Sequence, residues 1–227
     1  MTPNFTNTID ALAVAIFAFE TNQKKVVKEV TQWTDGKIKH YPNKHYLFGT
    51  FAKISNNPVY PAAVEITQDL VEKATALKTY VEQMVTMSML TKGQVNPFVH
   101  KLFEMIKEDQ LHFNNFGFII WAPKVMLDGE RASSIKEISA AFEHSSKYIG
   151  KVGERLSIEF TLIEKRYVRS VDTWSAYGHD DQGNLISFLT KKEELIVSGS
   201  IKGRIKAHEQ SRFHNNAKIT QLNHVKQ

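Results

Sequence analysis

Near the C-terminus, residues 201–208 alternate between cationic side chains and apolar or small ones. In a β-strand, side chains two residues apart point to the same face. The charged face consists of Lys202, Arg204, Lys206 and His208, and the opposite face of Ile201, Gly203, Ile205 and Ala207. Two residues of strand rise span about 6.6–7 Å, which approaches the spacing of phosphates along an extended single strand. Because such a row gains affinity for a polyanion by releasing counterions, it predicts a surface that binds single-stranded nucleic acid.

Six aromatic residues lie in the same part of the chain: Tyr148, Tyr167, Trp174, Tyr177, Phe188 and Phe213. A base stacked on an exposed ring gains roughly 1–3 kcal/mol whatever its identity. Phe213 lies in a polar loop and is the expected stacking residue. Trp174 and Tyr177 have opposite parity in one predicted strand, so at most one of them faces outward; core packing is the alternative for each ring. Three lysines complete the predicted binding set: Lys191, Lys192 and Lys218.

The net charge of the chain is concentrated in this region. The 227 residues include 29 Lys and Arg and 24 Asp and Glu. Residues 1–145 carry 15 of each sign, whereas residues 146–227 carry 14 basic and 9 acidic residues, so the whole excess of +5 lies in the C-terminal part. If the protein binds a polyanion, this part is expected to bind it. A solvated basic surface without a ligand is the alternative.

Few residues are arranged for catalysis or metal binding. Cysteine is absent, which excludes a disulfide framework, a thiol nucleophile and a cysteine-based zinc site. The nine histidines form no H-E-x-x-H motif, and the chain has neither a phosphate-binding P-loop nor a G-x-S-x-G motif. The adjacent Asp180 and Asp181 are better explained by turn propensity than by a nuclease metal site. We therefore expect no enzymatic activity, no cofactor and no metal.

Residues 11–20 (ALAVAIFAFE) form the one stretch that resembles a targeting segment. The stretch is too short to span a bilayer, and it lacks a preceding basic region and a following small-residue cleavage site. A buried or amphipathic helix is expected there. Together with the absence of cysteine, this favours a cytoplasmic protein that does not contact membranes.

Helical periodicity dominates residues 1–145. Apolar spacing predicts a helix from residue 8 to about residue 30, followed by the turn dipeptide at 35–36. A second, longer helix is predicted over 61–93, because Pro61 suits a first turn and an apolar stripe follows it. A third helix is predicted over 97–109.

Two aromatic or β-branched stretches interrupt this pattern and are predicted to be strands, at 45–55 and at 116–123. Ser134 and Glu137 fit a capping box that opens a further helix ending near Ser146. The first 145 residues are therefore expected to form a mainly helical region with short strands.

A period of two residues replaces the helical period after residue 146. Strands are predicted at 156–162, at 172–179 and 184–190 around the turn DDQG, at 193–208 and at 218–225. Glycines inside the fourth strand indicate a bulge or a sharp bend. The predicted fold class is α+β, with a mainly helical region at 1–145 and a small antiparallel OB-like β-barrel at 146–227. The boundary depends on the change of period alone.

The segment GRIKAH…F…KITQLNHVK, at residues 203–226, resembles the C-terminal signature of OB-fold modules that bind single-stranded nucleic acid in bacteriophage and other mobile-element proteins. YIGKVGERL, at 148–156, is similar to the first strand of these modules, and DDQGN, at 180–184, to their first hairpin. Two departures concern the loop after His208, which is about two residues longer than expected, and Leu222, which is out of phase with Ile219 and Val225. The second departure predicts a bulge or a strand end and leaves the facing of Lys218, His224 and Lys226 undetermined.

The resemblance implies a single-stranded DNA-binding accessory protein of phage or mobile-element DNA replication or recombination, sequence-nonspecific and acting in the host cytoplasm. RNA is not excluded as a ligand. The helical region is expected to form a homo-oligomer or to bind a replication or recombination protein. One alternative is a structural or protein-interaction protein, a virion or host-takeover component that uses the barrel for docking. A second alternative is an enzyme with an unrecognised site in the N-terminal region.

Overall fold

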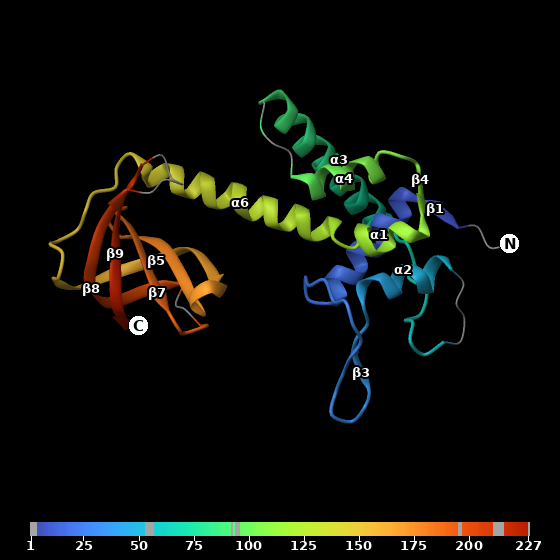
Figure 1. Ribbon diagram of the computed structural model, residues 1–227, viewed down its shortest axis with the longest axis horizontal. Coiled ribbons are helices and arrows are strands. Elements are labelled where there is room, and N and C mark those ends of the chain that lie inside the picture. Colours follow the sequence, from blue (N-terminus) through green and yellow to red (C-terminus); the bar gives the residue numbers. More distant parts are fainter. Residues whose placement is uncertain are drawn as a thin grey trace. The chain divides into compact units, whose positions relative to one another are not determined.

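The structure is a computed structural model that describes residues 4–52, 57–91, 93, 96–194, 197–210 and 216–226. The chain divides into two compact units, Met1–Glu130 and Arg131–Gln227. The first unit is mainly helical and the second contains a closed β-barrel, so the predicted α+β class is confirmed (Figure 1). The division falls inside helix α6 (Ala122–Glu143), whereas the change of sequence period lies near residue 146.

Helix α1 (Thr8–Thr21) is the central element of the first unit, because nine of its fourteen residues are buried and other helices surround it. Asn7 caps its first turn by accepting hydrogen bonds from the backbone N–H groups of Ile9 and Asp10. The helix ends well before the predicted residue 30. The two residues after the cap, 23 and 24, adopt left-handed backbone conformations that no helix can continue.

Three further helices pack in this unit: α2 (Asn43–Phe51), α3 (Gln68–Leu90) and α4 (Pro97–Ile106). The long helix α3 is confirmed, and its predicted stripe is buried at Leu70, Ala74, Leu77, Val81 and Val85. It begins at Gln68 rather than at residue 61, and Thr67 caps its first turn. Helix α4 is also confirmed and begins at the predicted proline, behind the cap Asn96.

Two predicted strands in this region are wrong. Residues 45–51 belong to α2, and the segment from 116 forms the short helix α5 (Phe116–Ile119) and then the start of α6. The aromatic rings that indicated strands pack instead around one core position, since Phe48 and Phe51 both contact Phe116, 5.2 and 6.0 Å away between ring centroids. A short apolar run without a clear period fits a buried helix as well as a buried strand.

The predicted capping box is also wrong. Ser134 and Glu137 lie in the interior of α6, which begins at Ala122. A serine followed by a glutamate three residues later starts a helix only where the preceding residues are not already helical, and here they are.

Two short sheets complete the first unit. Strand β1 (Phe5–Asn7) pairs with β4 (Gln110–His112), which is followed by the 3-10 turn η1 (Phe113–Asn115). Strand β2 (Thr31–Gln32) pairs with β3 (Ile38–His40) in a hairpin that turns at the predicted dipeptide 35–36.

The second unit is built on five strands that close into a barrel in the order β5-β6-β7-β9-β8, compatible with an OB-like barrel. The strands are β5 (Arg155–Val168), β6 (Thr173–Asp180), β7 (Leu185–Thr190), β8 (Ser198–Gln210) and β9 (Lys218–Lys226), with the 3-10 turn η2 (Arg169–Val171) between the first two. All pairs are antiparallel except β7 and β9. Directions cannot alternate completely around a ring of five strands, so one parallel pair is the minimum.

Apolar side chains fill the barrel and cover part of its outer face. The interior is filled by Phe160, Ala176, Ile186, Phe188, Ile201, Ile205 and Leu222. A second buried cluster lies on the outer face of the barrel and packs against Phe142 near the end of α6. It consists of Tyr177, Leu185, Ala217 and Ile219, and its strand residues alternate with the ones that face the interior. The strands approach closely at Gly178, where an added Cβ would overlap the Thr161 carbonyl oxygen.

Candidate nucleic-acid interface

Strand β8 has the alternation that its sequence predicts, up to residue 206. Ile201 and Ile205 are buried in the barrel, whereas Lys202, Arg204 and Lys206 are exposed on the outside. The cationic face therefore exists as an outer surface of a closed barrel.

His208 is separated from this row by a bulge. The pairing of β8 with β9 shifts between Ile205 and Ala207, so Lys206 is the extra residue. His208 then lies opposite the fully buried Thr220. Its Nε2 donates to the carbonyl oxygen of Ile149 at 3.1 Å, and its ring stacks on Tyr148 with centroids 4.6 Å apart. The imidazole is thus engaged at a different place on the barrel.

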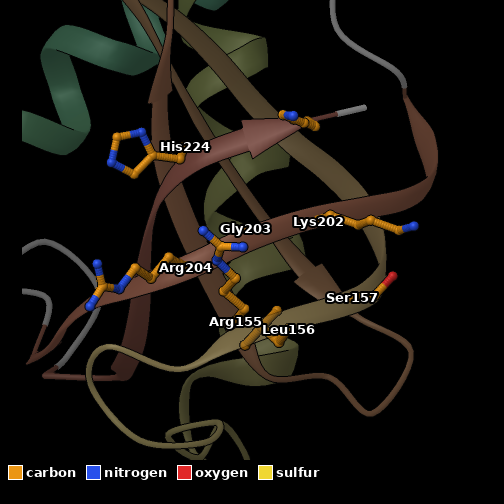
Figure 2. A pocket seen from close by; sticks show the side chains of 8 residues that line it. Arg155, Leu156, Ser157, Lys202, Gly203, Arg204 and His224 are labelled. Atoms are coloured by element: carbon orange, nitrogen blue, oxygen red, sulfur yellow. The ribbon is translucent and has the colours of Figure 1, made fainter.

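A groove of about 730 Å³ crosses three strands at the other end of the row. It is lined by Arg155, Leu156 and Ser157 of β5, by Lys202, Gly203 and Arg204 of β8, and by His224 and Lys226 of β9. Figure 2 shows that Arg155 and Arg204 project from neighbouring strands and that His224 lies on the next one. The groove gathers four Lys and Arg side chains and one histidine.

Strand register explains why these charges meet. Arg155 lies directly opposite Arg204, and Lys202 lies opposite Ser157 on one side and Lys226 on the other. The Nε of Arg204 donates to the carbonyl oxygen of Gly153 at 2.9 Å, which fixes the direction of its guanidinium group. Within the described parts of the chain, none of the ion pairs involves a cation of this groove.

A second bulge brings His224 into the groove. Lys202 pairs with Lys226 and Arg204 with Asn223, so two residues of β9 oppose the single Gly203. His224 takes a φ of 52°, a left-handed conformation. This bulge is the predicted cause of the phase shift between Leu222 and Val225, and it turns His224 and Lys226 toward the cations of β8. Ile219 differs in phase for another reason, because it belongs to the outer cluster against Phe142.

Acidic residues border the groove on one side. An adjoining pocket of about 370 Å³ shares Ser157 with the groove and is lined by Glu159, Asp180 and Asp181 among others. Along the outer face of β5 the charge therefore changes from Arg155 through Ser157 to Glu159. A polyanion that followed β5 would meet these carboxylates, whereas one that crossed the three strands would meet the cations of the groove, whose described lining contains no carboxylate.

The predicted aromatic residues that the structure describes, Trp174 and Tyr177, do not line the groove. Trp174 is partly exposed at the start of β6, with the Tyr167 ring 5.1 Å from its own and the Lys165 Nζ 4.6 Å from its centroid. Tyr177 is only 8 % exposed and belongs to the cluster against α6. Phe213 lies outside the described residues. The aromatic residues that the structure does describe contribute no side chain to the lining of the groove.

The remaining predicted lysines are exposed but dispersed. Lys191 and Lys192 follow β7, and Lys218 begins β9 with its Nζ 5.7 Å from the ring centroid of Tyr148. Of the predicted residues that the structure describes, the groove brings together Lys202 and Arg204.

Sequence reasoning missed Arg155 and Ser157. The signal was present, because both have the parity that faces away from the core in the alternation of β5. Strand β5 begins at Arg155, one residue before the predicted start, and this one residue supplies the partner of Arg204.

No family model matches the chain, and neither the curated proteins nor the solved structures include a significant match. Among the helices formed by the described residues, none combines the length and apolar character needed to cross a membrane. No group of three or more His, Cys, Asp or Glu side chains within those same residues is placed to hold a metal ion.

Proposed function

We propose that the barrel binds single-stranded nucleic acid, DNA in the first place, through phosphate contacts in the groove across β5, β8 and β9. The observation that carries the proposal is the convergence of Arg155, Lys202, Arg204 and Lys226 from three strands, without a carboxylate partner for any of them among the described residues. Structural cations at a surface are usually neutralised by acidic neighbours or dispersed. These four side chains are gathered in one groove, and none of them has an ion-pair partner among the described residues.

The dimensions favour a single strand over a duplex. Neighbouring strands lie about 4.8 Å apart and two residues rise about 6.8 Å, so the backbone positions of these cations fall within about 12 Å of one another. This span suits two or three successive phosphates of a flexible chain. The two backbones of a duplex are separated by grooves of roughly 6 and 12 Å, and the acidic border at Glu159 would face the second backbone.

Sequence preference is expected to be weak. The cations contact phosphates, and phosphate contacts carry no direct information about the bases. The groove offers one hydroxyl, Ser157, and one imidazole, His224, as groups that can reach a base edge. Together with the resemblance of residues 203–226 to phage and mobile-element modules, this supports a role as an accessory protein of DNA replication or recombination.

Fluorescence anisotropy with labelled oligothymidine tests the proposal directly. Affinity should fall steeply between about 50 and 200 mM salt, and each phosphate contact that a substitution removes should reduce the slope of log K against log salt by about 0.7. Lys202→Ala and Arg204→Ala should each show this reduction. Absence of binding at the low-salt end contradicts the proposal and favours the protein-docking alternative.

Lys206→Ala is the matched control. Lys206 is an exposed lysine on the same strand, four residues from Lys202, but it does not line the groove. If the groove is the site, Lys206→Ala retains most of the affinity. If both lysine variants lose affinity equally, the surface binds polyanions by its general charge and the groove has no special role. Competition with oligouridine and with duplex DNA distinguishes DNA from RNA and single from double strands.

A further inference from the structure

The hairpin formed by β2 and β3 is an exposed, ordered element of the first unit. It extends away from the surrounding helices of that unit (Figure 1), and no residue from 31 to 40 is buried. Its turn is nevertheless well formed: the Trp33 N–H donates to the Lys37 carbonyl oxygen at 2.8 Å, and the Gly36 N–H donates to the Trp33 carbonyl oxygen at 3.0 Å. Asp35 Oδ1 accepts from the Lys37 N–H at 3.0 Å. The hairpin is thus organised without a core of its own.

Trp33 is displayed by this turn. Its side chain is 56 % exposed, and the Nζ of Lys39 lies 4.2 Å from its ring centroid. The ring contributes nothing to the core clusters of the unit. Trp33 thus has the features of a base-stacking platform. It is a large aromatic residue next to an ordered turn, a cation approaches its ring, and more than half of its surface is open to solvent.

The charge around the hairpin has the sign that a nucleic acid requires. Residues 1–130 carry 13 basic and 13 acidic residues, but residues 23–45 alone carry six lysines and two acids, while the rest of the unit carries seven basic and eleven acidic residues. Lys37 pairs with Asp35 at 3.3 Å, and it is the one lysine of this segment in an ion pair among the described residues. A neutral unit therefore carries its local excess of positive charge in the segment of sequence that contains Trp33, and the Nζ of Lys39 from this segment lies against the Trp33 ring.

We propose that the hairpin at residues 31–40 is a second contact surface for single-stranded nucleic acid, in which a base stacks on Trp33 and Lys37 and Lys39 contact neighbouring phosphates. The inference rests on the proposed function of the barrel, since it assigns the same class of ligand to a second site. It would add a stacking component, because the described lining of the groove has cations without a Phe, Tyr or Trp ring, whereas the hairpin has both.

The experiment compares variants of the 227-residue chain in anisotropy titrations with labelled oligothymidine. Trp33→Ala should weaken binding by about five- to a hundredfold, the range that one stacked base contributes. Trp33→Phe should restore most of the affinity because it restores a ring. Lys39→Ala should weaken binding and reduce the salt slope. The matched control is Met87→Ala, which removes a side chain that is 58 % exposed outside the basic segment and should leave affinity unchanged.

Tryptophan fluorescence provides a second readout. The chain has three tryptophans, and quenching on addition of oligothymidine should largely disappear in Trp33→Phe, although that variant still binds. Quenching that persists unchanged in Trp33→Phe overturns the inference. So does a response of Trp33 to vesicles containing phosphatidylserine without any response to the oligonucleotide.

The two proposals fail in different ways. If Arg204→Ala weakens binding and Trp33→Ala does not, the hairpin inference is overturned and the groove stands. If Trp33→Ala weakens binding and Arg204→Ala does not, the groove is overturned and the hairpin stands. If the unsubstituted chain binds no oligonucleotide at low salt, both are overturned.

Discussion

Arg155 and Arg204 lie directly opposite each other on the neighbouring antiparallel strands β5 and β8. Like charges in this cross-strand relationship destabilise a sheet. The nearest stabilising contact is the hydrogen bond from Arg204 to the Gly153 carbonyl oxygen, which orients one guanidinium group without neutralising it. The two like charges therefore repel each other across the strands, and an anion that bridges the two arginines would reduce this repulsion.

Anion binding should accordingly stabilise the barrel. Tripolyphosphate is expected to raise the melting temperature of the barrel more than sodium chloride does at equal ionic strength, because a bound anion adds its binding free energy to the folded state. Arg155→Ser should remove part of this increase and should itself stabilise the anion-free barrel slightly. Differential scanning fluorimetry with and without tripolyphosphate measures both effects. Equal shifts with the two salts would contradict the assignment of the groove.

The acidic border predicts a substitution that improves binding. Glu159 is two residues from Ser157 along β5, about 7 Å in strand rise, which lies within the screening length of about 8 Å at physiological salt. Glu159→Gln should therefore tighten oligothymidine binding about two- to threefold, and more at lower salt. Glu209→Gln removes an exposed carboxylate from β8 at a place outside the groove and should change affinity less. A weaker complex with Glu159→Gln would mean that the nucleic acid follows another path.

How much of the molecule its sequence predicts depends on which interactions decide each element. The outer face of β8 follows from alternation alone, since a barrel strand must bury Ile201 and Ile205 and so exposes Lys202 and Arg204. The helix α2 cannot be predicted in this way, because Phe48 and Phe51 indicate a strand in the sequence. Only their packing against Phe116 shows why the segment is helical. Short apolar runs are decided by tertiary packing.

The groove itself lies between these cases. Its β8 residues are predictable, but the pairing of Arg204 with Arg155 depends on strand register. The position of His224 depends on a bulge in β9. The phase of Leu222 indicates that a bulge is present, but it does not indicate the geometry of the bulge. The separation of Trp174 and Tyr177 also depends on the barrel, because Trp174 lies near a strand end and Tyr177 belongs to the buried cluster that packs against Phe142.

Two glycines predict opposite effects of the same substitution. At Gly178 an added Cβ would overlap the Thr161 carbonyl oxygen and lie 2.6 Å from atoms of the Phe160 ring. Gly178→Ala should therefore destabilise the barrel by about 3 kcal/mol or more. At Gly117, in helix α5, a Cβ meets nothing within 4 Å, so Gly117→Ala should stabilise the first unit by up to about 1 kcal/mol. Hydrogen exchange during urea denaturation assigns each change to its unit, and similar effects at the two positions would contradict the packing described for Gly178.

Tyr46 predicts how the helical unit responds to alkaline pH. Its side chain is 6 % exposed in the core of that unit, and burial, with a smaller contribution from nearby Tyr41, raises the pKa of its hydroxyl above the ordinary value of about 10. The unfolded chain therefore loses this proton at a lower pH than the folded chain does. The resulting stabilisation is fully present below about pH 10 and is lost as the pH rises through the higher folded pKa.

Tyr46→Phe has no phenolic proton to lose, so the stability of this variant should fall less between pH 9 and pH 11 than that of the unsubstituted chain. At pH 8 the two proteins should differ in stability by less than about 1.5 kcal/mol. Urea denaturation of both proteins across this range, followed by circular dichroism at the helical signal, measures the difference, and parallel losses would show that other groups control alkaline unfolding.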